Sequence, residues 1–398
     1  MRIAIVNGFF LPLPPVGGGA TEKSWYNLAR QFAARGHTVT MFSRRWPGFP
    51  SHEIREGIHH VRLRGADHQR RLWKNLLLDF CWSWRVFFAL SKADIVIVNA
   101  IALPVWLGWL KPRAGRVVIM TGRMPKGQYR HYHHLARVLA PSSFVRDKVL
   151  TENPALKNKT RVCGYPINWQ LLNPSTALAA PPPPPDEPAA SDDLTIGFVG
   201  RIHEEKGLSM LADALQRVSE TAGLPAWRVL LCGPSDVARG GSGPEFRRQL
   251  EEKLSQSLPT GRFTLLDPQF DEHTLAATYR RIAIFCYPSL AAEGETFGVA
   301  VAEAMAAGAV PVVSQLACFT DFVHDGENGL SFDHTGSDAP VRLAAALIRL
   351  LRDAALRRKL AGAAQQSVRP FDYPNYADSL LADFATLTAP AGPSSSSP

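Results

Sequence analysis

Five consecutive prolines, Pro181–Pro185, interrupt this chain of 398 residues near its middle. Proline lacks a backbone N–H and restricts φ, so the run favours an extended polyproline II segment and excludes an interior strand or helix. A chain of this length can form two domains of ordinary size. We therefore expect an N-terminal domain over 1–173, a proline-rich linker over 174–193 and a C-terminal domain over 194–370.

The apolar runs on both sides of this linker favour strands that alternate with helices. The clearest expected strands are 2–7, 38–42, 95–98, 116–121, 194–199, 228–231 and 282–287, and the clearest expected helices are 21–34 and 208–219. A last helix over 371–388 is expected to pack back toward the first domain, and the Pro/Ser-rich tail 389–398 to be disordered. Repeated β-α units imply mostly parallel sheets covered by helices, so the expected fold class is α/β, with ligands between the two domains.

The net charge of +9 is distributed unevenly along the chain. Residues 1–173 carry 26 Lys and Arg against 8 Asp and Glu, a balance of +18, and residues 174–398 carry 18 against 27, a balance of −9. A basic half indicates an anionic partner, such as a membrane surface or a lipid phosphate. Nucleic acid is disfavoured because no nucleic-acid-binding motif occurs in a suitable context.

The cysteines and the apolar runs bear on the cellular compartment. The five cysteines form no CxxC pair, and several lie in apolar runs, so we interpret them as reduced core thiols of a cytosolic protein. Met1–Gly8 is too short for a signal peptide and is interpreted as a first strand. No uninterrupted apolar run reaches the length of about 18 residues that a transmembrane helix needs.

Two carboxylates frame the start of a helix in the second half. The strand ending at Tyr287 is followed by a loop with Glu295 and then by an Ala/Val-rich helix that contains Glu303. A carboxylate among apolar neighbours requires strong donors, and a helix N-terminus favours anions. Carboxylates for polyol hydroxyls beside a site for phosphate describe a nucleotide-sugar.

A second charged loop lies between strand 194–199 and helix 208–219. Arg201 and Lys206 stand beside Gly200 and Gly207, which suits the binding of a diphosphate. Because Glu204 and Glu205 lie between the two cations, a solvated charged loop is the alternative.

The first half contains two glycine-punctuated loops at strand ends. Gly17–Gly19 precede the first helix and can approach a phosphate or a sugar closely, although a plain turn remains an alternative. Residues 121–127 follow a strand and carry Arg123 and Lys126. The G-x-G-x-x-G fingerprint is absent, which disfavours a dehydrogenase.

Three further segments carry alternative interpretations. Residues 69–90 are amphipathic, basic at their start and rich in Trp and Phe, which fits either a core helix or a helix on an anionic membrane surface. Residues 103–110, with Trp106 and Trp109, are a second candidate for a lipid-facing surface. The histidines of 129–135 are interpreted as a basic face, since no carboxylate or cysteine accompanies them at metal-ligand spacing.

At these residues the chain resembles the retaining glycosyltransferases of family 4, which have the GT-B fold of two Rossmann-like domains facing across a cleft. The resemblance covers most of the chain and is strongest in the second half. Its motifs are Glu295-x7-Glu303 with Phe297-Gly298, Gly200-Arg201-x4-Lys206-Gly207, Asp325–Gly329 and, more loosely, Gly17–Gly19 with Arg35-Gly36-His37.

The resemblance implies a role for each matching residue. Glu303 would accept the ribose hydroxyls, Glu295 would bind the donor sugar, and Arg201 and Lys206 would neutralise the diphosphate without a metal ion. Backbone groups would complete a donor site whose further members are Gly18, Gly19, Gly200, Thr296, Phe297, Gly298 and Val299.

One departure from the family pattern concerns the acceptor side. Where the family commonly has a histidine in a Thr-x-His context, this chain has Thr121-Gly122-Arg123. Arginine cannot act as a base but can bind a phosphate or stabilise an oxyanion, so Arg123 joins the expected catalytic residues beside Glu295, Arg201 and Lys206.

The expected function is hexosyl transfer from a UDP- or GDP-sugar to a glycan, lipid-linked or small-molecule acceptor, with retention and without a metal or other cofactor. The resemblance further implies cell-envelope polysaccharide biosynthesis in the cytoplasm or peripherally on the inner face of the cytoplasmic membrane. The alternatives are a catalytically impaired nucleotide-sugar-binding relative and another GT-B enzyme, such as a nucleotide-sugar epimerase or a phosphorylase-like enzyme. The base, the sugar and the acceptor are left open by the residues.

Overall fold

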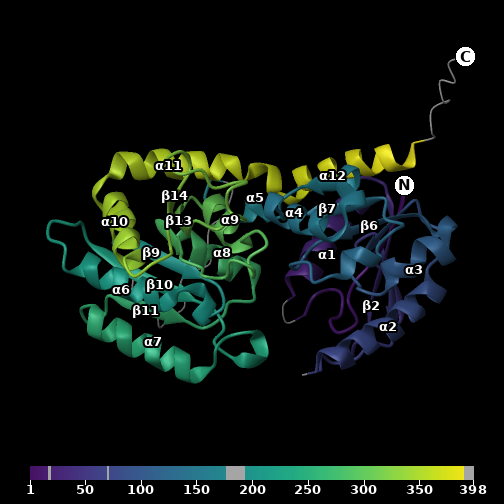
Figure 1. Ribbon diagram of the computed structural model, residues 1–398, viewed down its shortest axis with the longest axis horizontal. Coiled ribbons are helices and arrows are strands. Elements are labelled where there is room, and N and C mark those ends of the chain that lie inside the picture. The colour runs from purple at the N-terminus through teal and green to yellow at the C-terminus, as the bar shows by residue number, and fades with distance from the viewer. Residues whose placement is uncertain (17–18, 70, 176–192, 390–398) are drawn as a thin grey trace, which may run out of the picture. The chain divides into compact units, whose positions relative to one another are not determined.

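The computed structural model describes residues 1–16, 19–69, 71–175 and 193–389 (Figure 1). Contacts within the chain define two compact units, one formed by Met1–Pro166 with Tyr373–Pro398 and the other by Ile167–Asp372. The linker expected over 174–193 and the tail expected over 389–398 fall almost entirely outside the described residues.

The boundaries of the second unit differ from the expected 194–370. Residues 167–173 belong to this unit because Trp169 Nε1 donates to the Gln365 carbonyl at 3.0 Å and Arg280 donates to the Leu171 carbonyl at 2.9 Å. The final helix, α12 (Tyr373–Thr388), belongs to the first unit.

Among the described residues of the first unit, eight strands form one sheet in the order β3-β4-β2-β1-β5-β6-β7-β8. Every neighbouring pair is parallel except the hairpin β3–β4. The strands are β1 Arg2–Val6, β2 Thr38–Arg44, β3 His52–Arg55, β4 Ile58–Leu63, β5 Ile95–Val98, β6 Arg116–Met120, β7 Arg137–Ala140 and β8 Thr160–Val162.

The helices of this unit bury apolar stripes against the sheet. Trp82 and Val86 of α2 and Leu103 of α3 lie in one core cluster with alternate residues of β1 and β5, so α2 and α3 cover the same face. Phe32 of α1 meets Phe384 of α12 edge to face at 6.3 Å. The helices are α1 Ala20–Ala34, α2 Leu72–Ala89, α3 Leu103–Leu110 and α4 Ser143–Glu152, with short 3₁₀ turns at Pro112–Ala114, Gln128–His131 and Pro154–Lys159.

The second unit contains a sheet in the order β11-β10-β9-β12-β13-β14, with every pair parallel. Its strands are β9 Leu194–Val199, β10 Trp227–Cys232, β11 Phe263–Leu266, β12 Ile284–Tyr287, β13 Val310–Ser314 and β14 Leu330–Phe332. Its helices are α5 Trp169–Leu172, α6 Leu208–Ser219, α7 Pro244–Ser257, α8 Glu272–Arg280, α9 Val299–Ala306, α10 Ala339–Arg352 and α11 Ala354–Ser367, with 3₁₀ turns at Glu204–Lys206, Val237–Arg239 and Arg369–Phe371.

Both sheets are of the open, mostly parallel type, and the expected α/β fold class is confirmed. In the second unit the strand order reverses between β9 and β12. In open α/β sheets, the loops after the two strands at such a point run in opposite directions. They leave a crevice between them at the carboxyl ends of the strands, and ligands bind there. The loops after β9 and β12 are the two that carry Arg201 and Glu295.

Candidate functional site

The loops after β9 and β12 are in direct contact with each other. Gly207 has φ 67°, and a Cβ atom there would come within 2.0 Å of the Pro288 carbonyl oxygen. The position therefore requires glycine for both its conformation and its close approach. Gly207 ends the 3₁₀ turn Glu204–Lys206 and starts α6, so this contact fixes where Lys206 lies.

Lys206 and Glu295 form a buried ion pair at this point. Their relative exposures are 5% and 7%, and Lys206 Nζ donates to Glu295 Oε1. The hydroxyls of Tyr287 and Ser289 donate to the same oxygen, each at 3.1 Å. A buried pair of charges is tolerated only when it is well matched and hydrogen-bonded, and this carboxylate receives three donors.

The tyrosine of this cluster is strongly affected by its surroundings. Burial, followed by the negative charge of Glu295, raises the pKa of the Tyr287 hydroxyl well above its usual range. The hydroxyl is therefore a permanent donor, and the face of its ring lies 5.4 Å from Lys206 Nζ.

Arg201 lies nearer the surface than Lys206. Its guanidinium donates to Glu205 Oε1 at 2.6 Å and to the Gly240 carbonyl at 2.8 Å. Glu205 Oε1 is also 3.8 Å from Lys206 Nζ, so one carboxylate stands between the two cations. The sequence left open a solvated charged loop because Glu204 and Glu205 lie between the two cations. In the structure, Glu205 contacts both cations and is part of the cluster.

The residues after Glu295 lead into helix α9. Phe297 is 1% exposed and packs against Phe322 and Phe371, at 4.5 and 5.2 Å between ring centroids, so its side chain belongs to the core. Gly298 precedes the helix with φ 90°, and Val299 begins it. The expected contribution of Thr296 to Val299 is through the backbone, and the first-turn N–H groups of α9 point to this end of the helix.

Glu303 occupies the second turn of α9 and is intermediate in exposure. The hydroxyl of Tyr279, in α8, donates to its Oε2 at 2.9 Å. Burial and the charge of Glu303 raise the pKa of Tyr279 well above its usual range, so this hydroxyl also acts as a donor. Glu303 therefore has a strong neutral donor and keeps part of its surface accessible.

In the first unit, the structure places Gly19 before α1 and Arg123 in the exposed loop after β6. A Cβ atom at Gly19 would lie 2.6 Å from Glu22 Oε2, so the glycine leaves room for this carboxylate. Glu22 is buried; burial raises its pKa, which its own backbone N–H and the charge of Arg123 partly offset. Gly17 and Gly18 lie outside the described residues.

The structure thus brings Gly200, Arg201, Lys206 and Glu295 together at the ends of β9 and β12 in the second unit. Four residues of these clusters were not predicted as site residues from the sequence: Glu205, Tyr279, Tyr287 and Ser289. Tyr287 and Ser289 stand at the carboxyl end of a buried strand, and that position was the signal available for them. In the first unit, Glu22 was likewise not singled out.

The histidines of 129–135 do not gather around a possible ion. Over the part of the chain that the structure describes, no three His, Cys, Asp or Glu side chains are placed to hold a metal ion.

Two family models match the chain. The model of "Glycosyltransferase Family 4" matches residues 17–168, and that of "Glycosyl transferases group 1" matches residues 193–353. The phosphatidyl-myo-inositol mannosyltransferase of Mycobacterium leprae is 32% identical over 194 residues, which are 48% of this chain and 46% of that protein. The D-inositol 3-phosphate glycosyltransferase of Stackebrandtia nassauensis is 29% identical over 274 residues, 62% of this chain and 58% of that protein.

The chain therefore spans about half the length of the curated relatives it matches. A solved structure with a similar fold is sucrose-phosphate synthase from Thermosynechococcus elongatus, with a TM-score of 0.75 and 22% identity, covering 97% of this chain and 98% of that one. The fold is thus of the GT-B type. From the two matched regions together, this chain belongs to the group 1 glycosyltransferases of family 4.

Proposed function

We propose that this protein transfers a hexosyl group from a UDP- or GDP-linked sugar to an acceptor hydroxyl, with retention of the anomeric configuration and without a metal ion. One observation carries the proposal. The buried Lys206–Glu295 pair lies where the strand order of the second sheet reverses, beside Arg201 and the start of α9. Cations, a carboxylate and helix N–H groups at one strand edge suit a sugar diphosphate.

Each group has a stated part in this reaction. Arg201 and Lys206 neutralise the charge that develops on the diphosphate as the bond to the sugar breaks. Glu295 binds sugar hydroxyls, Glu303 accepts from the ribose hydroxyls, and the Thr296–Val299 backbone approaches the phosphates. The acceptor oxygen forms its bond to the anomeric carbon on the face that the diphosphate leaves, which retains the configuration.

On the acceptor side, the proposal assigns an anionic, phosphate-bearing polyol or its lipid-linked form. The two relatives are named for inositol-containing phosphorylated acceptors. Arg123 and Lys126 are exposed in the loop after β6, and residues 1–173 carry a charge balance of +18. A lipid-linked acceptor would be met by peripheral contact between this basic half and an anionic membrane on its cytoplasmic side.

The test begins with a panel of nucleotide-sugars in a thermal-shift assay, since binding to the folded state raises its apparent stability. The nucleotide-sugar that raises the melting temperature most is then offered with phosphorylated polyols, and NMR identifies the anomer formed. Retained configuration in a transfer product supports the proposal. An inverted product, or epimerised nucleotide-sugar without an acceptor, would refute it, and binding without turnover of any acceptor would favour an impaired relative.

A separate variant tests whether Arg123 binds the acceptor. Arg123→Ala should raise the KM for a phosphorylated acceptor by on the order of tenfold or more, since a charged hydrogen bond is lost. The thermal shift caused by the nucleotide-sugar should stay unchanged. An unaltered KM for the acceptor would remove Arg123 from this role.

A further inference from the structure

Helix α2 exposes an apolar face that the first unit leaves uncovered. Of its 18 residues only Asp79, Trp82, Ser83 and Val86 are buried. Its exposed large apolar residues are Leu72, Trp73, Leu76, Leu77, Phe80 and Phe88. Residues 72, 76, 80, 84 and 88 follow at intervals of four, so each is next to the following one and together they form a ridge that winds gradually around the helix.

Helix α3 extends the same surface. Trp106 stacks on Trp84 of α2 with ring centroids 5.3 Å apart, and meets the edge of Phe80 at the same distance. Ile101, Val105, Trp109 and Leu110 are exposed on and next to α3. We call the exposed apolar residues of α2, α3 and Ile101 the α2–α3 face.

The α2–α3 face is unusual within this protein. Most of the exposed large apolar side chains in the described part of the chain belong to it. Single exposed apolar residues are normal, whereas a contiguous patch marks an interaction surface. No helix in the described ranges is long and apolar enough to span a bilayer.

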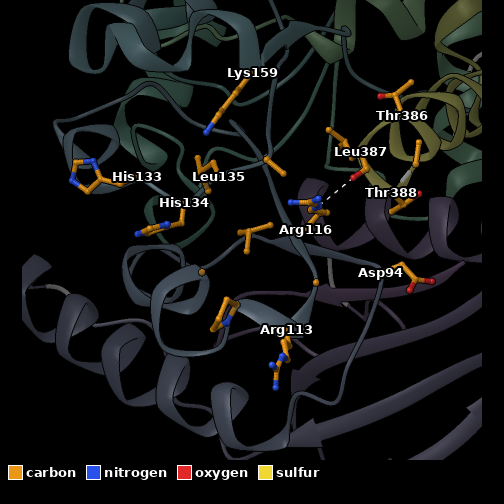
Figure 2. Close-up of a pocket in the computed structure, with 16 residues that line it drawn as sticks. Asp94, Arg113, Arg116, His133, His134, Leu135, Lys159, Thr386, Leu387 and Thr388 are labelled. Atoms are coloured by element: carbon orange, nitrogen blue, oxygen red, sulfur yellow. Dashed lines mark hydrogen bonds between the residues drawn. The ribbon is translucent and has the colours of Figure 1, made fainter. Parts of the chain in front are cut away.

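A basic groove adjoins this face within the first unit. A cavity of about 780 Å³ lies at the amino ends of β5, β6 and β7, and Figure 2 shows residues that line it. Its basic lining residues are Arg113, Arg116, His133, His134 and Lys159. The carboxylate that lines it, Asp94, is already paired with Arg2, at 2.7 Å to the backbone N–H and 3.2 Å to the guanidinium.

Helix α3 joins the groove to the apolar face. Gly108 lines the groove, and a Cβ atom there would lie 2.4 Å from His134 Cβ. Trp106, on another side of α3, packs against α2. Val105 and Trp109 are four apart and lie on the side between these two, so apolar surface and basic groove are continuous.

We propose that the α2–α3 face docks on a bilayer containing anionic phospholipids, with the groove of Arg113 and Lys159 at headgroup level. Tryptophan and phenylalanine favour the membrane interface, and basic side chains at its border complement lipid phosphates. A protein partner is the less suitable occupant, because the +18 balance of residues 1–173 favours a large anionic surface. This docking deepens the proposed function by placing the protein where a lipid-linked acceptor would be. It rests on the proposed function only in the assumption that the acceptor is presented at a membrane.

The test measures co-sedimentation of the full chain with vesicles of phosphatidylcholine alone and of equal phosphatidylcholine and phosphatidylglycerol. The apolar variant carries Trp73→Ser, Leu77→Ser and Trp109→Ser, residues that are 57%, 55% and 70% exposed. Its control carries Ile54→Ser, Val237→Ser and Val341→Ser, at exposed apolar positions outside the face. The charge variant is Arg113→Ala with Lys159→Ala, and its control is Arg55→Ala with Arg358→Ala.

The wild type should bind the mixed vesicles more tightly than phosphatidylcholine alone, and salt should weaken that preference. The apolar variant should bind both vesicles on the order of tenfold or more weakly. In the wild type, about half of each of these three side chains would be buried in the membrane interface, and serine provides no such apolar surface. The charge variant should lose the preference for the mixed vesicles by about thirtyfold, because it removes two basic residues that each contribute on the order of 1 kcal/mol. Both controls should behave as wild type.

Wild type that binds neither vesicle, or an apolar variant that binds as tightly as wild type, would overturn the inference. Concentration-dependent dimerisation in light scattering, lost in the apolar variant and accompanied by no vesicle binding, would assign the face to a second copy instead. The nucleotide-sugar thermal shift, measured on every variant, shows that each is folded. A wild type that binds vesicles but no nucleotide-sugar would refute the proposed function and leave this inference standing.

Discussion

At the scale of single residues, one carboxylate oxygen determines how the donor-side cluster is organised. Glu295 Oε1 receives Lys206 Nζ and the hydroxyls of Tyr287 and Ser289. Arg201 has a different carboxylate partner, Glu205, whose Oε1 it reaches at 2.6 Å. In the proposed function, the diphosphate of the donor would compete with these carboxylates for both cations, so that donor binding would exchange ion-pair partners.

This arrangement separates the structural part of Lys206 from its functional part. Lys206→Met should destabilise the protein by about 3–5 kcal/mol, because it leaves the Glu295 carboxylate buried without its counter-charge. The double variant Lys206→Met with Glu295→Gln should regain most of that stability, since no charge remains buried. Urea unfolding measures both changes.

Turnover should not follow stability in these variants. The double variant lacks both the Lys206 cation for the diphosphate and the Glu295 carboxylate for the sugar, so its kcat/KM should stay lower by orders of magnitude. Recovery of activity together with stability would show that Lys206 only supports the fold. A drop in kcat/KM below about threefold in the single variant would remove it from the reaction.

A second residue-scale prediction concerns His60, which is 1% exposed in β4. Burial, then the positive charge of Arg62, lowers the pKa of His60 from its ordinary 6.5 to about 4. Between pH 6.5 and 4, His60 is protonated in the unfolded chain and neutral in the folded one. The free energy of unfolding is therefore highest above pH 6.5 and decreases as the pH falls toward 4. The loss should approach about 1.4 kcal/mol per pH unit.

The difference between wild type and His60→Leu in the free energy of unfolding should show this slope over pH 6.5 to 4. Taking the difference removes the contributions of other titrating groups, such as the buried Glu22. His59→Leu, a substitution at the exposed neighbour in the same strand, is the control. A difference that stays constant with pH would mean that His60 is protonated in the folded protein throughout.

At the scale of elements, the site depends on how closely two loops approach each other. Gly207 gives the loop after β9 its contact with the Pro288 carbonyl in the loop after β12. The same loop is supported on its other side, where Ser242 Oγ accepts from the Glu204 N–H at 3.1 Å and Arg201 reaches Gly240.

Gly207→Ala and Gly223→Ala form a matched pair that isolates this contact. Both glycines have positive φ, 67° and 74°, but only at Gly207 would a Cβ meet other atoms, since none lies within 4 Å of that position at Gly223. Gly223→Ala should cost only the strain of a left-handed residue, about 1 kcal/mol. Gly207→Ala should cost several-fold more and should abolish the nucleotide-sugar thermal shift, because Lys206 would be displaced.

Equal losses in the two variants, by urea unfolding, would show that the two loops can separate without harm. Loss of stability in Gly207→Ala with an intact thermal shift would show that the position of Lys206 does not depend on this contact.

The elements with strong periodicity could be predicted from the sequence. Helix α6 has the expected bounds, Leu208–Ser219, and α1 begins one residue before the expected 21–34. Helix α12 begins two residues after the expected start at 371 and ends at 388 as expected. The hairpin of β3 and β4 was missed because its strands alternate charged and apolar residues over short spans, around the turn at Glu56 and Gly57. Helix α7 was missed because most of its residues are charged or polar, although the three apolar residues that it buries, Phe246, Leu250 and Leu254, recur at intervals of four.

The candidate site was only partly predictable for a different reason. The sequence indicated which residues carry charge at strand ends, namely Arg201, Lys206 and Glu295. It could not indicate that Lys206 pairs with Glu295, because 89 positions separate them and the pairing depends on how β9 and β12 are placed in the sheet. The same holds for Tyr279 and Glu303, which meet only because α8 packs against α9.

At the scale of the whole molecule, the first unit is completed by the last described helix of the chain. α12 brings Phe384 against Phe32 of α1, and its Asp383 pairs with Arg137 of β7 at 2.9 Å. Its Tyr376 hydroxyl donates to the Gly164 carbonyl at 3.3 Å. The chain thus leaves the first unit after Pro166 and returns to it at Tyr373. The stability of the first unit therefore depends on α12.

Phe384→Ala should therefore weaken the first unit selectively. The side chain is fully buried, and its truncation should cost about 3–5 kcal/mol. Amide hydrogen exchange should accelerate in peptides from α1 and the strands beside it, while peptides from α6 in the second unit and the nucleotide-sugar thermal shift stay unchanged. Thr386→Ala, at an exposed position of the same helix, should alter neither. Acceleration spread equally over both units would mean that they unfold as one cooperative body, and protection unchanged in α1 would mean that α12 is not needed to complete the first unit.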